Sequence, residues 1–336
     1  MTDLISPDKK QYKANLHCHS ILSDGARTPE ELKEMYRSHG YDILAITDHE
    51  RPFRHTALSE KDFLMLTGYE CYIRPDPKYD AYAEETHLNL FAKAPSNIKM
   101  ICFNDNYSRY LKRDNAVSDL VRVGDERPRE YSPSYINEYI RTAREHGYLV
   151  AYNHPYWSME SEEAILSYEG IFSIEMCNYS SYVLNGLDYS GALYDKMLCR
   201  GKRVFCHGSD DNHNQYPEGH VLSDSFGSFT MISPEEFTYA GVIEAMEKGD
   251  TYASMGPLFR RVSVDGDTVR VECSAVSHAY LYTGSKSPAH FHAEKGESFT
   301  SVEFKLDPRA RYIRVSVRDS EGRWADTRGF FPEEFR

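Results

Sequence analysis

The sequence predicts an α/β protein in which a barrel of about seven strand–helix units precedes a small sandwich of strands. Three observations lead to this fold class. Over residues 1–255, short apolar segments typical of buried strands alternate with helix-capping patterns, as in a mostly parallel sheet. Over residues 256–336 the capping patterns stop, and β-branched or alternating segments separated by turns replace them. The length of 336 residues leaves room for two domains.

The elements of the first part can be placed in order along the chain. Thr28 and Glu31 form a capping box, which predicts a helix that ends at Gly40. Ser-Pro pairs open two further expected helices, over 132–147 and 233–249. Buried strands are expected at 14–17, 42–47, 63–73, 86–92, 148–152, 171–177 and 203–206, with 226–232 as a further candidate. Units in this number can close into a barrel.

Residues 97–131 interrupt this alternation. They are rich in Arg, Asp, Asn and Tyr and have weak periodicity, which predicts an inserted lid or disordered loop. Later strands are expected at 262–264, 269–273, 279–282, 302–306 and 312–317. The predicted domains are therefore a barrel over 1–255, which contains the insertion, and a β-sandwich over 256–336.

The charge and the cysteine content restrict the partners and the compartment. Lys and Arg total 39 and Asp and Glu total 52, so 39 − 52 gives a formal net charge of −13. An acidic chain disfavours non-specific nucleic-acid binding, whereas bound cations can still attract a small phosphorylated molecule. The seven cysteines form no C-x-x-C, so reduced thiols in a cytoplasm are expected. No apolar run is long enough to span a membrane, and the N-terminus lacks a signal-peptide core.

The most informative motif is His17-Cys18-His19, at the end of the first strand. In an extended segment, residues i and i+2 point to one face, so both imidazoles can bind one ion while Cys18 points away. A second pair with this spacing, His290 and His292, lies in the sandwich region. No cluster of acidic residues or histidines surrounds it in the sequence, so an ordinary polar role is expected there.

Further metal-binding side chains follow the other predicted strands. They are Asp24, His49, Glu70, His87, His154, Asp211 and His213. Barrel enzymes place their sites at the carboxyl ends of the strands, so these residues are expected to meet. Strands also end in polar residues where they emerge into solvent, but Lys, Arg, Ser or Gln would serve that purpose equally. The repeated choice of His therefore indicates metal.

In these motifs the chain resembles the PHP family, the polymerase and histidinol phosphatase metal-dependent phosphoesterases. The resemblance covers about residues 12–255, and the tail of short strands is similar to that of two-domain members. The matching residues are His17-x-His19, Ser23-Asp24-Gly25, Thr47-Asp48-His49, Glu70, His87, Asn153-His154-Pro155 and Asp211-x-His213. The resemblance implies a distorted (β/α)7 TIM-like barrel with a trinuclear metal centre.

The resemblance also implies which residues hold each metal. The first position would be held by His17, His19, Glu70 and Asp211. The second would be held by His87, His154 and a bridging Glu70, and the third by Asp24, His49 and His213. The residues expected to act in catalysis are Glu70, His154, Asp211 and His213. Imidazole and carboxylate ligands without thiolate suit two or three Zn, Mn or Fe ions and do not choose among them.

Three further carboxylates are candidates for supporting the ligands. Asp210 stands where many family members have Ser; it could bind metal itself, but a position behind the ligands is expected. Asp48 and Glu175 are expected to orient imidazoles. For Glu175, a structural carboxylate at a strand end is an equal alternative.

The expected reaction is hydrolysis of phosphate esters, with a small phosphorylated metabolite or a nucleotide as the substrate. A hydroxide shared between the metals would attack phosphorus, because metal binding lowers the pKa of water to near 7. Arg51 and Arg54, which follow His49 closely, are expected to bind the substrate phosphate, and Arg109 and Arg113 are alternatives.

Two other functions stay open at this point. The same metal cluster could cleave carbamate or amide bonds instead. Alternatively, the metals could only stabilise the barrel while the sandwich binds a carbohydrate or a protein. The sequence speaks against the second alternative, because structural metal sites are usually closed sets of four Cys and His ligands.

Overall fold

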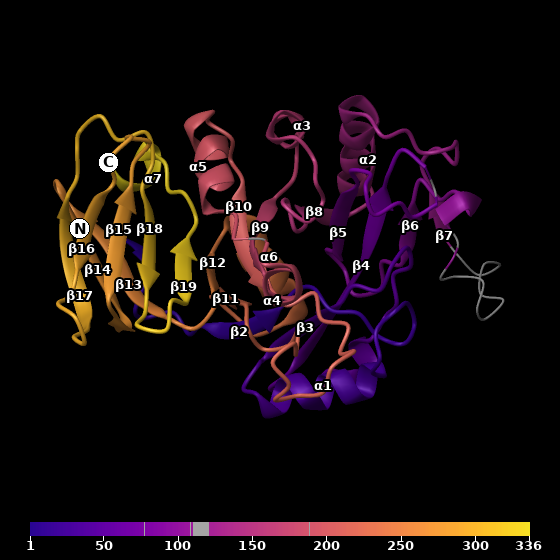
Figure 1. Ribbon diagram of the computed structural model, residues 1–336, viewed down its shortest axis with the longest axis horizontal. Coiled ribbons are helices and arrows are strands. Elements are labelled where there is room, and N and C mark those ends of the chain that lie inside the picture. The colour runs from indigo at the N-terminus through magenta and orange to yellow at the C-terminus, as the bar shows by residue number, and fades with distance from the viewer. Residues whose placement is uncertain (77, 108, 110–120, 188) are drawn as a thin grey trace.

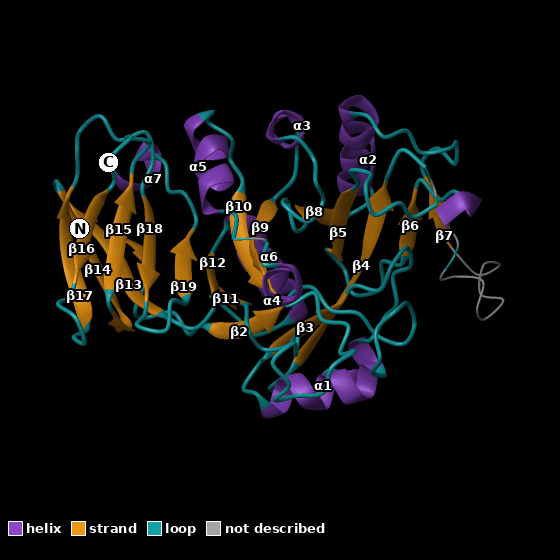
Figure 2. Cartoon of the chain, viewed as in Figure 1, coloured by secondary structure: helices purple, strands orange, loops and turns teal. Residues whose placement is uncertain are grey.

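The computed structural model describes residues 1–76, 78–107, 109, 121–187 and 189–336 (Figure 1). The fold is mixed α/β, with one sheet of 13 strands, one of four strands and one of two strands. Helices flank the first part of the large sheet, whereas the C-terminal part is built mainly of strands (Figure 2). This agrees with the predicted change from strand–helix units to strands.

The strands of the first part coincide with the predicted apolar segments, except for β12, which was not predicted. They are β2 (Tyr12–Asn15), β3 (Ile43–Ile46), β4 (Leu64–Ile73), β5 (Thr86–Ala92), β8 (Tyr148–Tyr152), β9 (Ser173–Asn178), β10 (Phe205–Ser209), β11 (Phe229–Ile232) and β12 (Thr251–Ser254). Most of their residues are buried, as in sheets covered on both faces.

The sheet direction differs from the prediction at β5. Strands β2, β3 and β4 pair in parallel, and so do β8, β9 and β10. Strand β5 is antiparallel to both β4 and β8, and the described residues between β4 and β5 form no helix. The expectation of a strand–helix unit at every step is wrong here, because a parallel pair needs a long crossover that this loop does not supply.

Strand β10 approaches β11 without pairing with it through a ladder. The strand order ends at β10 on one side, so the ladders among the described residues do not close a barrel. The Thr230 hydroxyl donates to the carbonyl oxygen of Gly208 at 2.8 Å. A Cβ at Gly208 would lie 2.5 Å from the Ser228 hydroxyl and 2.9 Å from the Phe229 carbonyl oxygen. Only glycine therefore fits this close approach.

The helices are α1 (Pro29–Ser38), α2 (Pro133–Glu145), α3 (Glu162–Ser167), α4 (Tyr179–Asn185), α5 (Gly191–Cys199), α6 (Tyr239–Lys248) and α7 (Pro332–Phe335). The capping box at Thr28 and Glu31 is confirmed, since each side chain bonds the backbone N–H of the other. The predicted start of α6 at Ser233 is wrong. Thr238 caps this helix by accepting from the N–H of Gly241, and the residues before it form a turn.

The insertion contains two short strands, β6 (Lys99–Ile101) and β7 (Val121–Val123), which pair in parallel. A single turn of 3₁₀-helix, η2 (Asp105–Tyr107), follows β6, and another, η1 (Thr56–Leu58), precedes β4. The expectation of a lid or disordered loop also covers residues 108 and 110–120, which lie outside the described residues.

The C-terminal part contains two facing sheets. Strands β13 (Phe259–Asp265), β14 (Thr268–Val276) and β17 (Phe299–Lys305) form the smaller sheet with β1 (Thr2–Ile5). The strands β15 (His278–Tyr282), β16 (Ala289–His292), β18 (Arg314–Arg318) and β19 (Trp324–Thr327) extend the large sheet, because β19 pairs with β12. Apolar residues of both sheets belong to one buried cluster, and both chain ends lie in this part (Figure 1).

Two predictions about composition can be compared with the structure. All seven cysteines are free thiols, as expected. In the described part of the chain, every helix is too short or too polar to cross a membrane.

Candidate metal centre

The predicted ligands come together at one edge of the large sheet. His17 and His19 follow β2, His49 follows β3, and Glu70 lies in β4. His154 follows β8, and Asp211 and His213 follow β10. These positions agree with the expected carboxyl ends of parallel strands.

His87 reaches the same edge in a different way. It is the second residue of β5, so the expectation that it lies at a carboxyl end is wrong. Because β5 runs antiparallel to β4, its first residues lie beside the last residues of β4, and His87 pairs in register with Tyr72.

One group of ligand atoms surrounds His17 and Asp211. The Oδ1 atom of Asp211 lies 3.1 Å from Nε2 of His17 and 3.0 Å from Nε2 of His19. Glu70 Oε1 lies 3.3 Å from the same His17 nitrogen. Two ligand atoms that each lie about 2.1 Å from one ion are separated by roughly 3–3.5 Å, so these spacings fit a shared cation.

Glu70 also joins a second group, with His87 and His154. Its Oε1 lies 3.0 Å from Nδ1 of His87 and 3.3 Å from Nε2 of His154. The three side chains are almost fully buried and can hold a metal ion together. Glu70 therefore lies between two groups of imidazoles.

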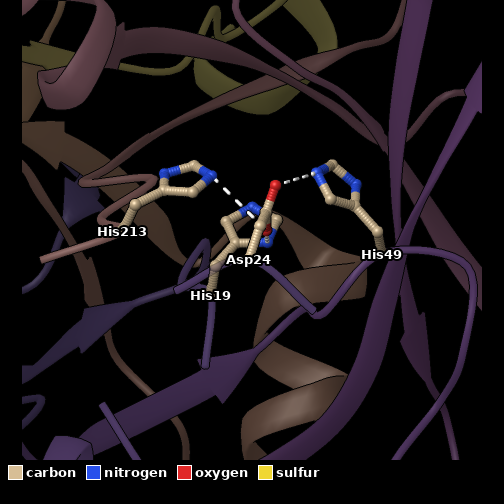
Figure 3. A group of neighbouring side chains, drawn as sticks. All are labelled: His19, Asp24, His49 and His213. Atoms are coloured by element: carbon tan, nitrogen blue, oxygen red, sulfur yellow. Dashed lines mark ion pairs between the residues drawn. The ribbon is translucent and has the colours of Figure 1, made fainter. Parts of the chain in front are cut away.

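The third group is centred on Asp24 (Figure 3). Its Oδ2 lies 3.4 Å from Nε2 of His49, and its Oδ1 lies 3.6 Å from Nε2 of His213. The Nδ1 atom of His19 lies 3.5 Å from Asp24 Oδ1, so His19 faces this group with one nitrogen and Asp211 with the other. The carboxylate stands between the imidazoles, as a ligand of a common ion would.

The electrostatics of the cluster favour added positive charge. Burial alone would lower the pKa of His17, but the nearby carboxylates of Asp211 and Glu70 raise it to about 10. Burial alone would also lower the pKa of His87, but the carboxylate of Glu70 raises it to about 10. Conversely, the imidazoles hold the pKa of Glu70 well below its usual range despite its burial. The carboxylates thus favour the protonated imidazoles, and a metal cation could supply the same positive charge in place of these protons.

Glu175 supports the ligands from behind. Its Oε1 accepts from His17 Nδ1 at 2.8 Å, and its Oε2 accepts from the backbone N–H of His154 at 2.7 Å. Although burial raises the pKa of Glu175, the neighbouring His17 lowers it to about 2, so this carboxylate only accepts. His17 therefore donates through Nδ1 and turns Nε2 toward Asp211.

Asp48 and Asp210 act on the loops rather than on the imidazoles. Asp48 accepts from the hydroxyl groups of Ser20 and Ser23 at 2.7 Å and 2.6 Å, so it contacts His19 only through Ser23, whose hydroxyl lies 3.4 Å from the ring. Asp210 accepts from the backbone N–H groups of residues 226–228. Burial raises the pKa of Asp210 to about 7.

Two of the candidate ligands have a backbone conformation that side chains rarely adopt. The φ angle is +24° at His154 and +54° at Asp211. Such conformations cost free energy and persist where the surrounding structure fixes them, commonly at functional sites. The bond from His154 N–H to Glu175 is one of the contacts that fix them.

A cavity of about 180 Å³ opens above the cluster. Its lining includes side chains that the sequence did not single out: Tyr72, Arg74, Tyr79, Glu85 and Trp157. Arg109, one of the two alternatives for binding the phosphate, also belongs to the lining. Arg51 and Arg54, the predicted phosphate-binding residues, do not belong to this lining; the Arg51 guanidinium lies 4.7 Å from the ring centre of Phe53. Arg113 lies outside the described residues.

Strand periodicity explains why Arg74 reaches the cavity. Glu70, Tyr72 and Arg74 are spaced by two along β4 and its end, so they point to one face. Arg74 pairs with Glu85 at 3.3 Å, and its guanidinium lies 4.4 Å from the ring centre of Tyr72. The alternation along β4 was the pattern in the sequence that could have identified Arg74.

Comparison with known proteins adds a family to this geometry. Residues 15–103 match the model of the PHP domain. This segment is therefore similar to PHP domains. A search of curated proteins gives no match.

The match covers only some of the ligands. His17, His19, Asp24, His49, Glu70 and His87 lie in the matched segment of the PHP domain. His154, Asp211 and His213 lie beyond it, and the fold brings them to the same place.

The solved structures that are similar to this chain have low sequence identity to it. A two-domain protein from Bacteroides vulgatus that contains a predicted PHP-like metal-dependent phosphoesterase is 15% identical, with 98% of this chain and 90% of that chain covered and a TM-score of 0.43. A protein from Bifidobacterium adolescentis assigned as a metal-dependent phosphoesterase is 19% identical, with coverages of 63% and 92% and a TM-score of 0.39. An amidohydrolase from Chromobacterium violaceum is 17% identical, with coverages of 60% and 87% and a TM-score of 0.38. All three TM-scores are below 0.5, so we draw our conclusions from the PHP-domain match and the chain's own residues.

Proposed function

We propose that the protein is a metal-dependent hydrolase of phosphate esters that acts on a small phosphorylated metabolite or a nucleotide. The observation that carries the proposal is the convergence of buried imidazoles on Glu70, whose two carboxylate oxygens face separate groups of histidines. The PHP-domain match supports the same class of chemistry. The donor set fits divalent cations, because imidazole and carboxylate together suit Zn, Mn or Fe.

The cluster has room for two or three ions. We assign the first to His17, His19, Glu70 and Asp211, the second to Glu70, His87 and His154, and the third to Asp24, His49 and His213. Bound ions would supply a nucleophile at neutral pH, because they lower the pKa of water, and would neutralise charge on phosphate oxygens. We also infer that β10 and β11 complete a distorted barrel around this site, and that residues 1–255 and 256–336 are its two domains.

The chain's own residues would position the ligands and the substrate. Glu175 keeps His17 in the tautomer whose Nε2 faces the cluster. Glu70, His154, Asp211 and His213 would surround the reacting group. Asp48 holds the loop that carries His19 and Asp24, and Asp210 fixes residues 226–228 beside the loop that carries Asp211. We assign the binding of the phosphate to Arg74, which lines the cavity, in place of Arg51 and Arg54.

The direct test is elemental analysis of the purified protein, followed by hydrolysis assays with the metal that is found. Phosphomonoesters, phosphodiesters and carbamates would be compared, with the Glu70→Ala variant as the control for adventitious activity. We expect phosphate release by the unaltered chain and none by the variant, which should also bind less metal. Cleavage of carbamates alone would favour the alternative, a carbamate or amide hydrolase. An absence of turnover with every metal tried would refute the proposed enzyme activity.

A further inference from the structure

A second group of histidines lies on the outer strands of the C-terminal part. Strands β15 and β16 pair antiparallel, and His278 is directly opposite His292. His290 lies two residues before His292 on β16, so its side chain points to the same face. His290 and His292 are exposed and His278 is half-buried, so all three imidazoles can be reached from solvent. The sequence showed only the H-x-H pair, because the third member comes from a neighbouring strand.

Two ring separations in this group are short. The ring centres of His278 and His292 are 4.4 Å apart. The ring centres of His290 and His292 are 5.2 Å apart, as are those of His17 and His19. Imidazoles whose nitrogens lie about 2.1 Å from a common ion have ring centres roughly 4.5–5.3 Å apart at ordinary coordination angles. Both neighbouring pairs are thus close to the spacing of a shared ion, and the exposed side chains of His290 and His292 would turn to bring all three ligand atoms within reach of it.

The hydrogen bonds of Ser277 define which nitrogen of His278 is available. Its hydroxyl lies 3.2 Å from the carbonyl oxygen of Arg318 and 2.8 Å from Nδ1 of His278. A hydroxyl has one proton, and the carbonyl can only accept, so Ser277 donates to Arg318 and accepts from His278. Nδ1 of His278 is therefore protonated in the neutral ring, and Nε2 has the lone pair that a metal requires.

We propose that His278, His290 and His292 form a second metal site, for a divalent transition ion that prefers imidazole, such as Zn²⁺, Cu²⁺ or Ni²⁺. Three imidazoles would hold the ion, and its remaining positions would face solvent. Since the ligands come from both β15 and β16, a bound ion ties the edge strand β16 to the sheet. The site is separate from the cluster around Glu70 and does not depend on the proposed enzyme activity.

The test is equilibrium dialysis of the full chain against Zn²⁺ alone, with the bound metal counted per chain. We expect His292→Ala and His290→Gln each to remove about one equivalent relative to the unaltered chain. His220→Ala, which changes an exposed histidine outside both groups, should remove none. Ser277→Ala should weaken binding at this site by about 10–100-fold, because it removes the group that orients His278. His220, His290 and His292 are exposed and Ser277 is half-buried, so we expect the variants to fold, which thermal melts of each metal-free variant would verify.

The outcomes separate this site from the candidate centre. Glu70→Ala should lower the metal content at the centre while leaving the equivalent that depends on His292. The proposal is overturned if folded His292→Ala and His290→Gln variants bind as much Zn²⁺ as the unaltered chain. It is also overturned if His220→Ala removes the same equivalent, since that would indicate non-specific binding to surface histidines.

Discussion

At the scale of single residues, Glu175 holds the proposed metal ligands in place without being one of them. It accepts from His17, from the backbone of His154 and from the hydroxyl of Ser209, the last at 2.5 Å. We expect Glu175→Gln to lower metal affinity or turnover by about 10–100-fold, because the loss of a carboxylate behind a metal ligand typically has that effect. Glu70→Gln should lower metal affinity or turnover by a larger factor, since it changes a proposed metal ligand itself. Metal titration and kcat/KM of both variants, with the exposed Glu169→Gln as control, would test this order.

The raised pKa values of His17 and His87 lead to a second expectation at this scale. Both are about 10 in the protein without ions, so both rings are protonated at pH 7. An ion binds only the neutral ring, so metal binding must release these protons, and affinity should increase as the pH rises from 7 toward 10. Calorimetric titration in two buffers with different ionisation enthalpies would show a release of about two protons at pH 7. Binding without proton release would contradict the assignment of these two residues.

The ligand residues could be predicted because their types are rare and their positions at strand ends are regular. The residues around the cavity could be predicted less well: Arg109, an alternative in the sequence, lines it, whereas Arg74 was not predicted. Arg51 and Arg54 lie close to His49 in the sequence, but side-chain direction decides which residues reach the cavity. Arg74 reaches it because it shares a strand face with Glu70, and that requires the extent of β4 to be known.

At the scale of elements, the insertion is tied to the turn that carries His49. Arg129, at the end of the insertion, donates to both carboxylate oxygens of Glu50 at 2.7 Å, and both side chains are about 1% exposed. Glu50 follows His49 directly and has a φ of +65°. Its Oε1 also accepts from the backbone N–H of Tyr72, so the pair connects the insertion, this turn and β4.

We therefore expect Arg129→Ala to destabilise the protein by about 3–5 kcal/mol, because it leaves a buried carboxylate without its partner. Activity should fall as well, since the turn that places His49 loses its anchor. Arg127→Ala is the matched control: its side chain is 39% exposed, and losing its pair with Glu138 should cost at most about 1 kcal/mol. Denaturant unfolding would measure both. Equal effects of the two variants would show that the buried pair has no special role.

The elements themselves were largely predictable, and the exceptions have physical causes. The predicted bounds of strand β5, 86–92, agree with the observed ones, but its direction was not predicted. The direction depends on the connection before β5, whose sequence has no helical periodicity. The start of α6 was displaced because Ser233 resembles a cap in sequence, whereas the Thr238 side chain makes the capping bond. Local patterns define an element better than they define its ends.

At the scale of the whole molecule, strands of each predicted domain pair with strands of the other. Strand β1 pairs with β13, so the N-terminus lies in the C-terminal sheet, and β12 pairs with β19. The buried Arg314 guanidinium donates to Asp326 on β19 at 2.7 Å and to Asp195 on α5 at 2.6 Å. The sequence indicated that helix-capping patterns end near residue 255. Pairing between distant strands leaves no local pattern in the sequence, so the strand pairs that join the two parts could not be predicted.

This joining predicts the behaviour of a shortened chain. A chain that ends at residue 255 would lose the partner strands of β1 and β12, and Asp195 would lose Arg314. We expect it to unfold at a lower temperature and less cooperatively than the full chain, or to aggregate through the exposed edge of β12. A chain that lacks only residues 1–5 is the control, because it removes β1 but keeps β12 paired; its loss of stability should be smaller. Calorimetry and size-exclusion chromatography of the three chains would decide. If the shortened chain melted as sharply and at the same temperature as the full one, the first 255 residues would fold independently, and the strand pairs between the parts would contribute little to stability.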